Sequence, residues 1–327
     1  MKNEYRVAVL FLACVTLACL SACASPDSSE GLSSVSQVTL ESQAVQTGAI
    51  EESGRVALYI KLPSSYRDSP DRRYPVVYGL HGFGDDPRQM VSPFSNALEE
   101  ASGPEAIFVA VDGTNRLGGS FYANSAATGN WEDLVVEEVV AFMDANYRTE
   151  PSAERRMLAG FSMGGFAAWN IALAHPDVFG YAWSCCPGAW DANGLADTLA
   201  MWDNVYRNAY GAAFSPDTSR GYPHARVPSR DGSAADAEVV ADWEKGFGGI
   251  DAKLADYAAQ SSRLGGIRFA YASSDEYQWI SRGAQHAAQR MLDSGLPVGI
   301  NGFAGGHAVS NAMIGQSFVP FAQSAFD

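Results

Sequence analysis

Short apolar runs alternate with longer amphipathic segments along most of the chain. The short runs are bounded by Gly, Pro and charged residues, which is typical of buried strands. The longer segments repeat apolar residues at helical spacing, which predicts helices. The predicted strands cover residues 55–62, 75–80, 106–111, 156–159, 179–185, 267–272 and 298–303, and the predicted helices cover 131–147, 165–174, 280–292 and 311–326.

The order of these elements predicts an α/β fold with a mainly parallel central sheet and helices on both of its faces. Residues 187–266 interrupt the alternation with a stretch rich in Trp, Tyr and Phe. Segments this long inside a domain are usually functional or contain helices of their own, and we expect helices near 197–210 and 251–261. We predict a cap-like insertion beside an active site. A surface insertion without a function is the alternative.

The first residues have the pattern of an export leader. Lys2 and Arg6 flank the start of an apolar run, residues 7–20, that is too short to span a bilayer comfortably. The run leads into Leu20-Ser21-Ala22-Cys23, which resembles the lipobox of bacterial lipoproteins. The resemblance implies that residues 1–22 are a signal peptide and that Cys23 carries a lipid after cleavage. The protein would then be exported and anchored to a membrane of the cell envelope. An ordinary cleaved leader is the alternative.

Residues 24–52 are rich in Ser, Gln, Thr and acidic residues and contain no aromatic residue. Such a segment buries too little apolar surface to order itself. We therefore predict that residues 23–52 consist of the lipid-bearing cysteine and a flexible tether. Residues 53–327, about 275 in number, would form one large domain. Because 47% of the chain is hydrophobic, that domain has ample material for a core.

Charge and cysteine usage narrow the possible partners. The net charge of −15 argues against nucleic acid, because no basic patch is present to neutralise phosphates. Of the five cysteines, Cys185 and Cys186 are adjacent and the others lie in the leader. For this adjacent pair we favour two packed thiols over a strained bridge. No C-x-x-C spacing or similar ligand pattern occurs, so we expect no metal and no other cofactor.

The stretch Gly160-Phe161-Ser162-Met163-Gly164 fits the G-x-S-x-G pattern of a nucleophile elbow, between a predicted strand and a predicted helix. The turn forces strained backbone angles on the serine and exposes its hydroxyl. Side chains in place of the flanking glycines would collide across the turn. The start of the helix offers free N–H groups to a developing oxyanion. These features predict that Ser162 is a catalytic nucleophile.

A serine nucleophile needs a base, and the base needs an orienting acid. His307 follows the last predicted strand on a Gly-rich loop, and Asp275 follows the strand before it. The chain order Ser162, Asp275, His307 is that of α/β hydrolases. Glu276 is the alternative acid, and we favour Asp275 because its shorter side chain suits the contact with the ring nitrogen.

The loop after the strand at 75–80, Leu80-His81-Gly82-Phe83-Gly84, supplies the second oxyanion donor in this kind of fold. We assign one N–H group to Met163 and the other to Phe83. His81 is predicted to brace the turn, and it is also a candidate for contact with the substrate.

Five segments together resemble the putative esterase family of α/β hydrolases, typified by esterase D and including feruloyl esterases. These segments are Leu80-His81-Gly82, Trp131-Glu132-Asp133, Asn146-Tyr147-Arg148-Thr149, the Gly-rich elbow ending at Gly165, and Gly305-Gly306-His307. The resemblance covers about residues 55–326. It implies the α/β-hydrolase fold and the triad of Ser162, Asp275 and His307. The Trp-Glu-Asp helix start is most similar to bacterial feruloyl esterases. Two departures are Ala272, where relatives often have glycine, and the long segment 187–266.

The sequence therefore predicts a serine carboxylesterase that works through an acyl-serine. We expect a small-molecule or polysaccharide ester as substrate, with carbohydrate-linked acetyl or feruloyl esters favoured. Trp190 and Trp279 are candidates for stacking on such a substrate, and core packing is equally compatible with their pattern. Two other functions remain open: an acyltransferase with a sugar acceptor and the same triad, and a non-catalytic carbohydrate-binding lipoprotein.

Overall fold

The computed structural model describes residues 35–229 and 234–327. The predicted signal peptide, Cys23 and the first part of the predicted tether lie outside these residues. In the part of the chain that is described, no helix has the length and apolar character needed to cross a membrane.

The described residues form an eight-stranded sheet in the order β1-β2-β4-β3-β7-β8-β9-β10. β2 pairs antiparallel with both β1 and β4, and the remaining neighbours are parallel. The strands are β1 (Ser36–Glu41), β2 (Arg55–Lys61), β3 (Val76–Leu80), β4 (Ile107–Val111), β7 (Arg156–Phe161), β8 (Tyr181–Cys185), β9 (Gly266–Ala272) and β10 (Val298–Phe303). A two-stranded ribbon, β5 (Asn124–Ser125) and β6 (Gly129–Asn130), lies outside this sheet.

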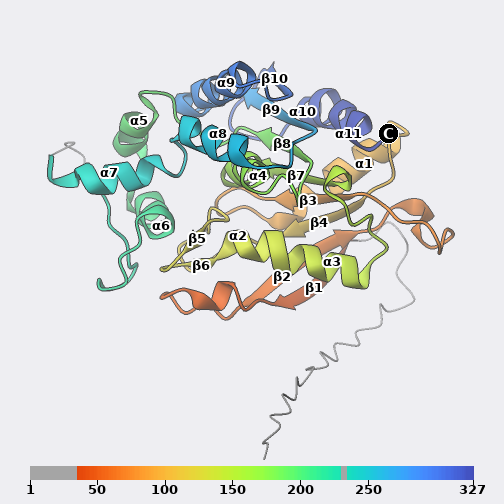
Figure 1. The fold of residues 1–327 in the computed structure, drawn as a ribbon, viewed down its shortest axis with the longest axis horizontal. Helices are drawn as coiled ribbons and strands as arrows, with labels where there is room; N and C mark the ends of the chain where they lie inside the picture. The colour runs from red at the N-terminus through yellow and green to blue at the C-terminus, as the bar shows by residue number, and fades with distance from the viewer. Residues whose placement is uncertain (1–34, 230–233) are drawn as a thin grey trace, which may run out of the picture. The chain divides into compact units, whose positions relative to one another are not determined.

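Helices cover both faces of the sheet (Figure 1). β3 and β4 are buried along their whole length, as expected for parallel strands that are covered on both sides. The covering elements are α1 (Ser92–Glu100), α2 (Trp131–Asp133), α3 (Val140–Asn146), α4 (Met163–Ala174), α8 (Ile250–Ala259), α9 (Gln278–Asp293), α10 (Asn311–Met313) and α11 (Val319–Phe326). π-Helical turns at Leu134–Val139 and Ile314–Phe318 continue α2 into α3 and α10 into α11.

The predicted α/β architecture is confirmed, and the predicted strands and helices recur with shifts of one or two residues at most of their ends. The helix predicted at 197–210 is instead two helices, α5 (Gly194–Met201) and α6 (Asn204–Phe214). The break comes at Asp203, whose side chain accepts hydrogen bonds from two backbone N–H groups of α6 and so caps a new helix. Helices α1 and α7 (Ala237–Glu244) were not predicted.

The prediction of a flexible tether up to residue 52 is wrong for residues 35–52. β1 pairs with β2 along its full length, with Ser36 opposite Ile60 and Glu41 opposite Arg55. Farther along, the Glu138 carboxylate accepts backbone hydrogen bonds from two residues of this segment, at 3.0 Å each. The segment is held largely by backbone hydrogen bonds to β2, and composition does not record such bonds. The ordered domain therefore includes residues 35–52.

The segment between β8 and β9 has two parts. α5, α6 and α7 lie together beyond one end of the sheet, as Figure 1 shows. α8 instead packs on α4 and buries Ile250, Leu254 and Tyr257. The predicted insertion at 187–266 is therefore shorter than expected: α8 belongs to the layer of helices on the sheet. Below, "the insertion" means residues 187–249.

Candidate active site

The turn from β7 into α4 has the conformation of a nucleophile elbow. Ser162 has φ 53° and ψ −112°, in the left-handed region that non-glycine residues rarely adopt. Its N–H donates to the Cys185 carbonyl at 2.9 Å. A Cβ on Gly160 would lie 1.9 Å from the Gly164 carbonyl oxygen, and one on Gly164 would lie 2.0 Å from the Leu80 carbonyl oxygen. Both glycines are therefore required for this turn, as the sequence predicts.

The three predicted triad residues lie together. His307 Nε2 is 2.9 Å from Ser162 Oγ, and His307 Nδ1 is 2.7 Å from Asp275 Oδ2. The other oxygen of Asp275 accepts from the Tyr277 N–H at 2.8 Å. Asp275 is fully buried, so its hydrogen bonds hold both the carboxylate and the imidazole ring in one orientation.

The alternative acid, Glu276, has a different position. Its side chain is exposed and accepts a hydrogen bond from the backbone N–H of His307 at 2.8 Å. Glu276 therefore contacts the main chain of His307, whereas Asp275 contacts the ring. Of the two carboxylates, Asp275 is the one that continues the hydrogen-bonded chain from Ser162.

The environment of His307 favours its charged form. Burial by itself would lower the pKa of the imidazole, but hydrogen bonds and charges from Asp275 and Cys186 raise that pKa to about 9. The pKa of Cys186 is lowered to about 6, first by a hydrogen bond from Cys185, against the effect of burial, and then by His307. Sequence reasoning did not place Cys186 beside the triad, because adjacent cysteines at the end of a strand give no indication of which group they face.

Both predicted oxyanion donors adjoin Ser162. Met163 is the first residue of α4, where helical N–H groups have no partner in the preceding turn. Phe83 lies in the loop after β3, which is tied to α4 by a hydrogen bond from the Gly164 N–H to the His81 carbonyl at 3.1 Å. Both Phe83 and Met163 line the same cavity as Ser162 and His307.

His81 braces this loop and does not contact the cavity. Its ring is 1% exposed. Nε2 accepts from the Gly113 N–H at 2.8 Å, so Nδ1 carries the proton and donates to the Gly82 carbonyl at 2.7 Å. Both ring nitrogens are therefore used within the loops. The prediction of a substrate contact at His81 is wrong, and the prediction of a bracing role is confirmed.

The cavity above Ser162 has a volume of about 220 Å³ and mostly aromatic walls. Trp279 lies in its wall, where a contact with a substrate stays a prediction, and no protein group accepts a hydrogen bond from its indole N–H among the described residues. Trp190 does not line the cavity: its indole N–H donates to Thr198 at 3.0 Å, and its ring packs behind Phe247 at 5.6 Å. Trp190 is therefore a core residue, and the prediction of a substrate contact there is wrong.

Three polar residues of the cavity were missed by sequence reasoning. Asp85, Tyr206 and Tyr277 line it. Burial raises the pKa of Asp85, partly offset by His81 and His307. Burial also raises the pKa of Tyr206, which is hydrogen-bonded to Tyr277. The position of Asp85 directly after the Gly-Phe-Gly turn could have identified it, whereas the two tyrosines come from separate segments that only the fold brings together.

Known proteins resemble this chain in sequence. The model of the putative esterase family matches residues 50–264. The chain belongs to the putative esterase family. An esterase of Mycobacterium tuberculosis (strain H37Rv) is 33% identical over 127 residues, which is 38% of this chain and 27% of the relative. A xylanase/feruloyl esterase of Xylanibacter ruminicola is 32% identical over 127 residues, 36% of this chain and 17% of the relative. The matched region thus spans only about a quarter or less of these relatives.

Solved structures share the fold of this chain. A ferulic acid esterase superposes with a TM-score of 0.60 at 17% identity, covering 90% of this chain and 98% of the other. At this identity the likeness establishes the α/β-hydrolase fold. It confirms the fold predicted from the sequence.

Proposed function

We propose that the protein is a serine carboxylesterase that works through an acyl-serine intermediate. The observation that carries the proposal is the continuous hydrogen-bonded chain from Ser162 Oγ through His307 to Asp275, next to an open cavity. Membership of the esterase family supports the same reaction. A binding protein that performs no chemistry would have no need for a serine held in a strained turn against a buried His–Asp pair.

The reaction runs in two halves. In the first, Ser162 Oγ attacks the ester carbonyl carbon while His307 Nε2 takes the hydroxyl proton. The N–H groups of Met163 and Phe83 stabilise the oxyanion. As the C–O bond breaks, His307 returns its proton to the leaving alcohol. In the second half, a water molecule gives a proton to His307 and attacks the acyl-serine, and the protonated His307 then restores the Ser162 hydroxyl as the acid leaves.

The cavity favours an ester of an aromatic acid. Its walls carry Phe83, Trp202, Tyr206 and Phe247, which can enclose a flat ring on several sides. Asp85 and the Tyr206–Tyr277 pair add polar groups that suit ring hydroxyls. One relative is named as a feruloyl esterase. We therefore propose carbohydrate-linked hydroxycinnamoyl esters as the favoured substrates, with acetyl esters as smaller ones.

The purified protein tests this proposal with p-nitrophenyl acetate and methyl ferulate. We expect hydrolysis of both, and a loss on the order of 10⁴- to 10⁶-fold in kcat for Ser162→Ala. Ser261→Ala is the matched control, because Ser261 is exposed at the end of α8 and should keep full activity. A Ser162→Ala protein with full activity would refute the assignment. Activity on the acetate alone would refute only the aromatic substrate.

We also propose that the protein is exported and lipid-anchored through Cys23. The apolar leader and the lipobox-like residues before Cys23 support this. Radiolabelled palmitate fed to cells that express the protein should label the parent chain but not Cys23→Ala. Equal labelling of both would exclude Cys23 as the attachment site.

A further inference from the structure

A fourth reactive group faces the His307–Asp275 pair, and the proposed hydrolysis does not use it. Cys186 follows β8 with φ 43°, and its N–H donates to the Ala270 carbonyl of β9 at 2.8 Å. The Cys186 sulfur, a ring nitrogen of His307 and a carboxylate oxygen of Asp275 all lie within 4.8 Å of one another. Strand pairing thus fixes a thiol beside the base and the acid of the triad.

These three groups are a sulfur, a nitrogen and an oxygen donor, the ligand types that bind zinc in proteins. Ligand atoms held tetrahedrally by zinc lie roughly 3.3–3.6 Å apart, given bond lengths of about 2.0–2.3 Å. The three ligand atoms lie within 4.8 Å of one another, so the cluster must contract to reach that arrangement, while the 2.7 Å contact between Asp275 and His307 must open. Three protein ligands leave one coordination position for water from the cavity.

Charge also favours a divalent ion at this position. A thiolate and a carboxylate together neutralise a charge of +2, so the buried site would carry no net charge. A sulfur ligand with only one carboxylate suits Zn²⁺ or Cd²⁺ and does not suit Mg²⁺ or Ca²⁺, which prefer several oxygen ligands. In residues 35–229 and 234–327, no other group of three such side chains is close enough to hold an ion.

We propose that Cys186, His307 and Asp275 form a binding site for a thiophilic divalent cation such as Zn²⁺, and that the bound ion stops hydrolysis. Binding releases the thiol proton and any proton on the coordinating ring nitrogen to solvent. An ion on Nε2 occupies the nitrogen that takes the Ser162 proton. An ion on Nδ1 displaces the hydrogen bond that lets Asp275 orient the ring. In either case the base is lost.

The ion can reach the cluster from the cavity side. His307 and Ser162 both line the cavity, and the His307 side chain is 17% exposed while Cys186 is fully buried behind it. Rotation of the imidazole therefore opens the path to the thiol. The neighbouring Cys185 is equally buried and free, but its sulfur lies 3.5 Å from Met313 Sδ and it is not part of the cluster. The Cys185 thiol also donates a hydrogen bond to Cys186 Sγ at 3.9 Å, and a serine hydroxyl at position 185 can still donate one, so Cys185→Ser is the matched control.

Calorimetry with ZnCl₂ and MgCl₂ on the full chain tests the site without any substrate. We expect one Zn²⁺ per chain at the site in the parent and in Cys185→Ser, an affinity at least about tenfold weaker in Cys186→Ser, and no Mg²⁺ binding there. If Cys186→Ser folds poorly, Cys186→Gly is the second variant, because glycine adopts the positive φ of this position without strain. The leader cysteines are the same in all proteins, so differences between variants isolate position 186.

Co²⁺ provides a second measurement on the same proteins. A thiolate-to-cobalt absorption band should appear in the parent and in Cys185→Ser and be absent from Cys186→Ser. With p-nitrophenyl acetate as substrate, Zn²⁺ should inhibit the parent, and EDTA should restore its activity. At the same Zn²⁺ concentration, Cys186→Ser should keep a larger fraction of its own metal-free rate. Equal Zn²⁺ affinity in all variants, or no binding in any, would overturn the proposal. Ser162→Ala should still bind Zn²⁺, so this outcome is independent of the esterase assignment.

Discussion

The rim of the sheet is the edge at which β7 to β10 have their carboxyl ends. It is held together in a different way from the insertion. Ser162, Asp275 and His307 follow the carboxyl ends of β7, β9 and β10, and parallel pairing of β7 through β10 brings those ends to one edge. The triad thus spans 145 residues between Ser162 and His307, yet lies within hydrogen-bond distance. The insertion is instead held mainly by side-chain packing. The ring of Tyr210 contacts six other aromatic rings: Phe121, Trp190, Trp202, Phe214, Trp243 and Phe247. Strand register therefore positions the chemistry, and aromatic packing shapes what can reach it.

Among variants that keep the Ser162 nucleophile, the largest effect should come from the acid at the rim. Asp275→Asn keeps the size of the side chain but removes the charge that orients and stabilises the His307 ring, so kcat should fall by about 10⁴-fold. Glu276→Gln is the matched change at the neighbouring carboxylate. It should cost far less, because Glu276 touches only the His307 backbone. Both are measured as kcat with p-nitrophenyl acetate.

The reverse ranking of these two variants would show that Glu276 is the orienting acid. It would also mean that the loop after β10 takes another conformation in solution. Thermal unfolding of both variants should be recorded alongside, so that a loss of structure is separated from a loss of chemistry.

The next largest effect should be a pH dependence of kcat/KM that arises from groups at the rim and not from the insertion. His307 must be neutral to accept the Ser162 proton, and its raised pKa of about 9 keeps it protonated at neutral pH. kcat/KM should therefore rise about tenfold per pH unit below pH 9 and level off above it. Because Asp275 is one of the groups that raise this pKa, the rising limb of Asp275→Asn should move to lower pH. A flat profile between about pH 6 and pH 9 would contradict this.

These two regions also differ in how far the sequence predicts them. The triad follows from the order of Ser162, Asp275 and His307, because parallel strands bring their carboxyl ends to one edge whatever the length of the connections. The cavity walls do not follow from order or pattern. Trp190 and Trp279 look alike in sequence, yet one packs behind Phe247 and the other lines the cavity. That difference depends on where the helices of the insertion pack.

The same reasoning explains the other differences between the predictions from the sequence and the structure. β1 was missed because its backbone hydrogen bonds to β2, the next strand along the chain, leave no mark in the composition of the segment. Cys186 was not recognised as a neighbour of the triad because its partners, His307 and Asp275, are far from it in the sequence. In each case the local sequence is compatible with the structure, and the missing information is a long-range contact.

A moderate effect on selectivity should come from the insertion. Tyr206 lines the cavity from α6, with its ring 4.8 Å from that of Phe83. Tyr206→Ala removes one aromatic contact, so KM for methyl ferulate should rise by roughly fivefold to tenfold while p-nitrophenyl acetate is little affected. Val205→Ala on the same helix is the control, because Val205 is exposed and does not line the cavity. An equal change for both esters would mean that the cavity does not hold the acyl group.

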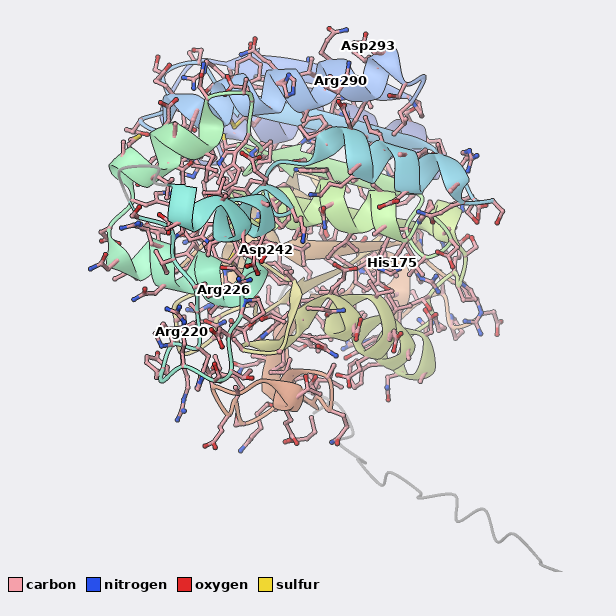
Figure 2. All side chains as sticks on the ribbon, turned by 60° about the vertical axis from the view of Figure 1, so that its left-hand side comes forward. His175, Arg220, Arg226, Asp242, Arg290 and Asp293 are labelled. Atoms are coloured by element: carbon pink, nitrogen blue, oxygen red, sulfur yellow. The ribbon has the colours of Figure 1, made fainter. Side chains whose placement is uncertain are left out.

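The smallest effect should come from the ion pairs within the insertion. Arg226 pairs with Glu238 and Asp242 of α7, and Figure 2 shows Arg226 and Asp242 beside each other, away from Arg290 on α9. Arg226→Ala should lower the free energy of unfolding by about 1 kcal/mol and the Tm by no more than about 3 °C. Arg290→Ala, which loses only exposed pairs, should change the Tm less.

Acetate hydrolysis should be unchanged in both arginine variants, because Ser162, His307 and Asp275 are positioned by strands that neither arginine touches. Unchanged acetate hydrolysis would show that the geometry of the triad does not depend on the ion pairs of the insertion. If Arg226→Ala removed acetate hydrolysis while the protein stayed folded, the rim would depend on the insertion for its geometry. Strand register would then be insufficient to position the triad, and the insertion would have to be counted as part of the catalytic structure.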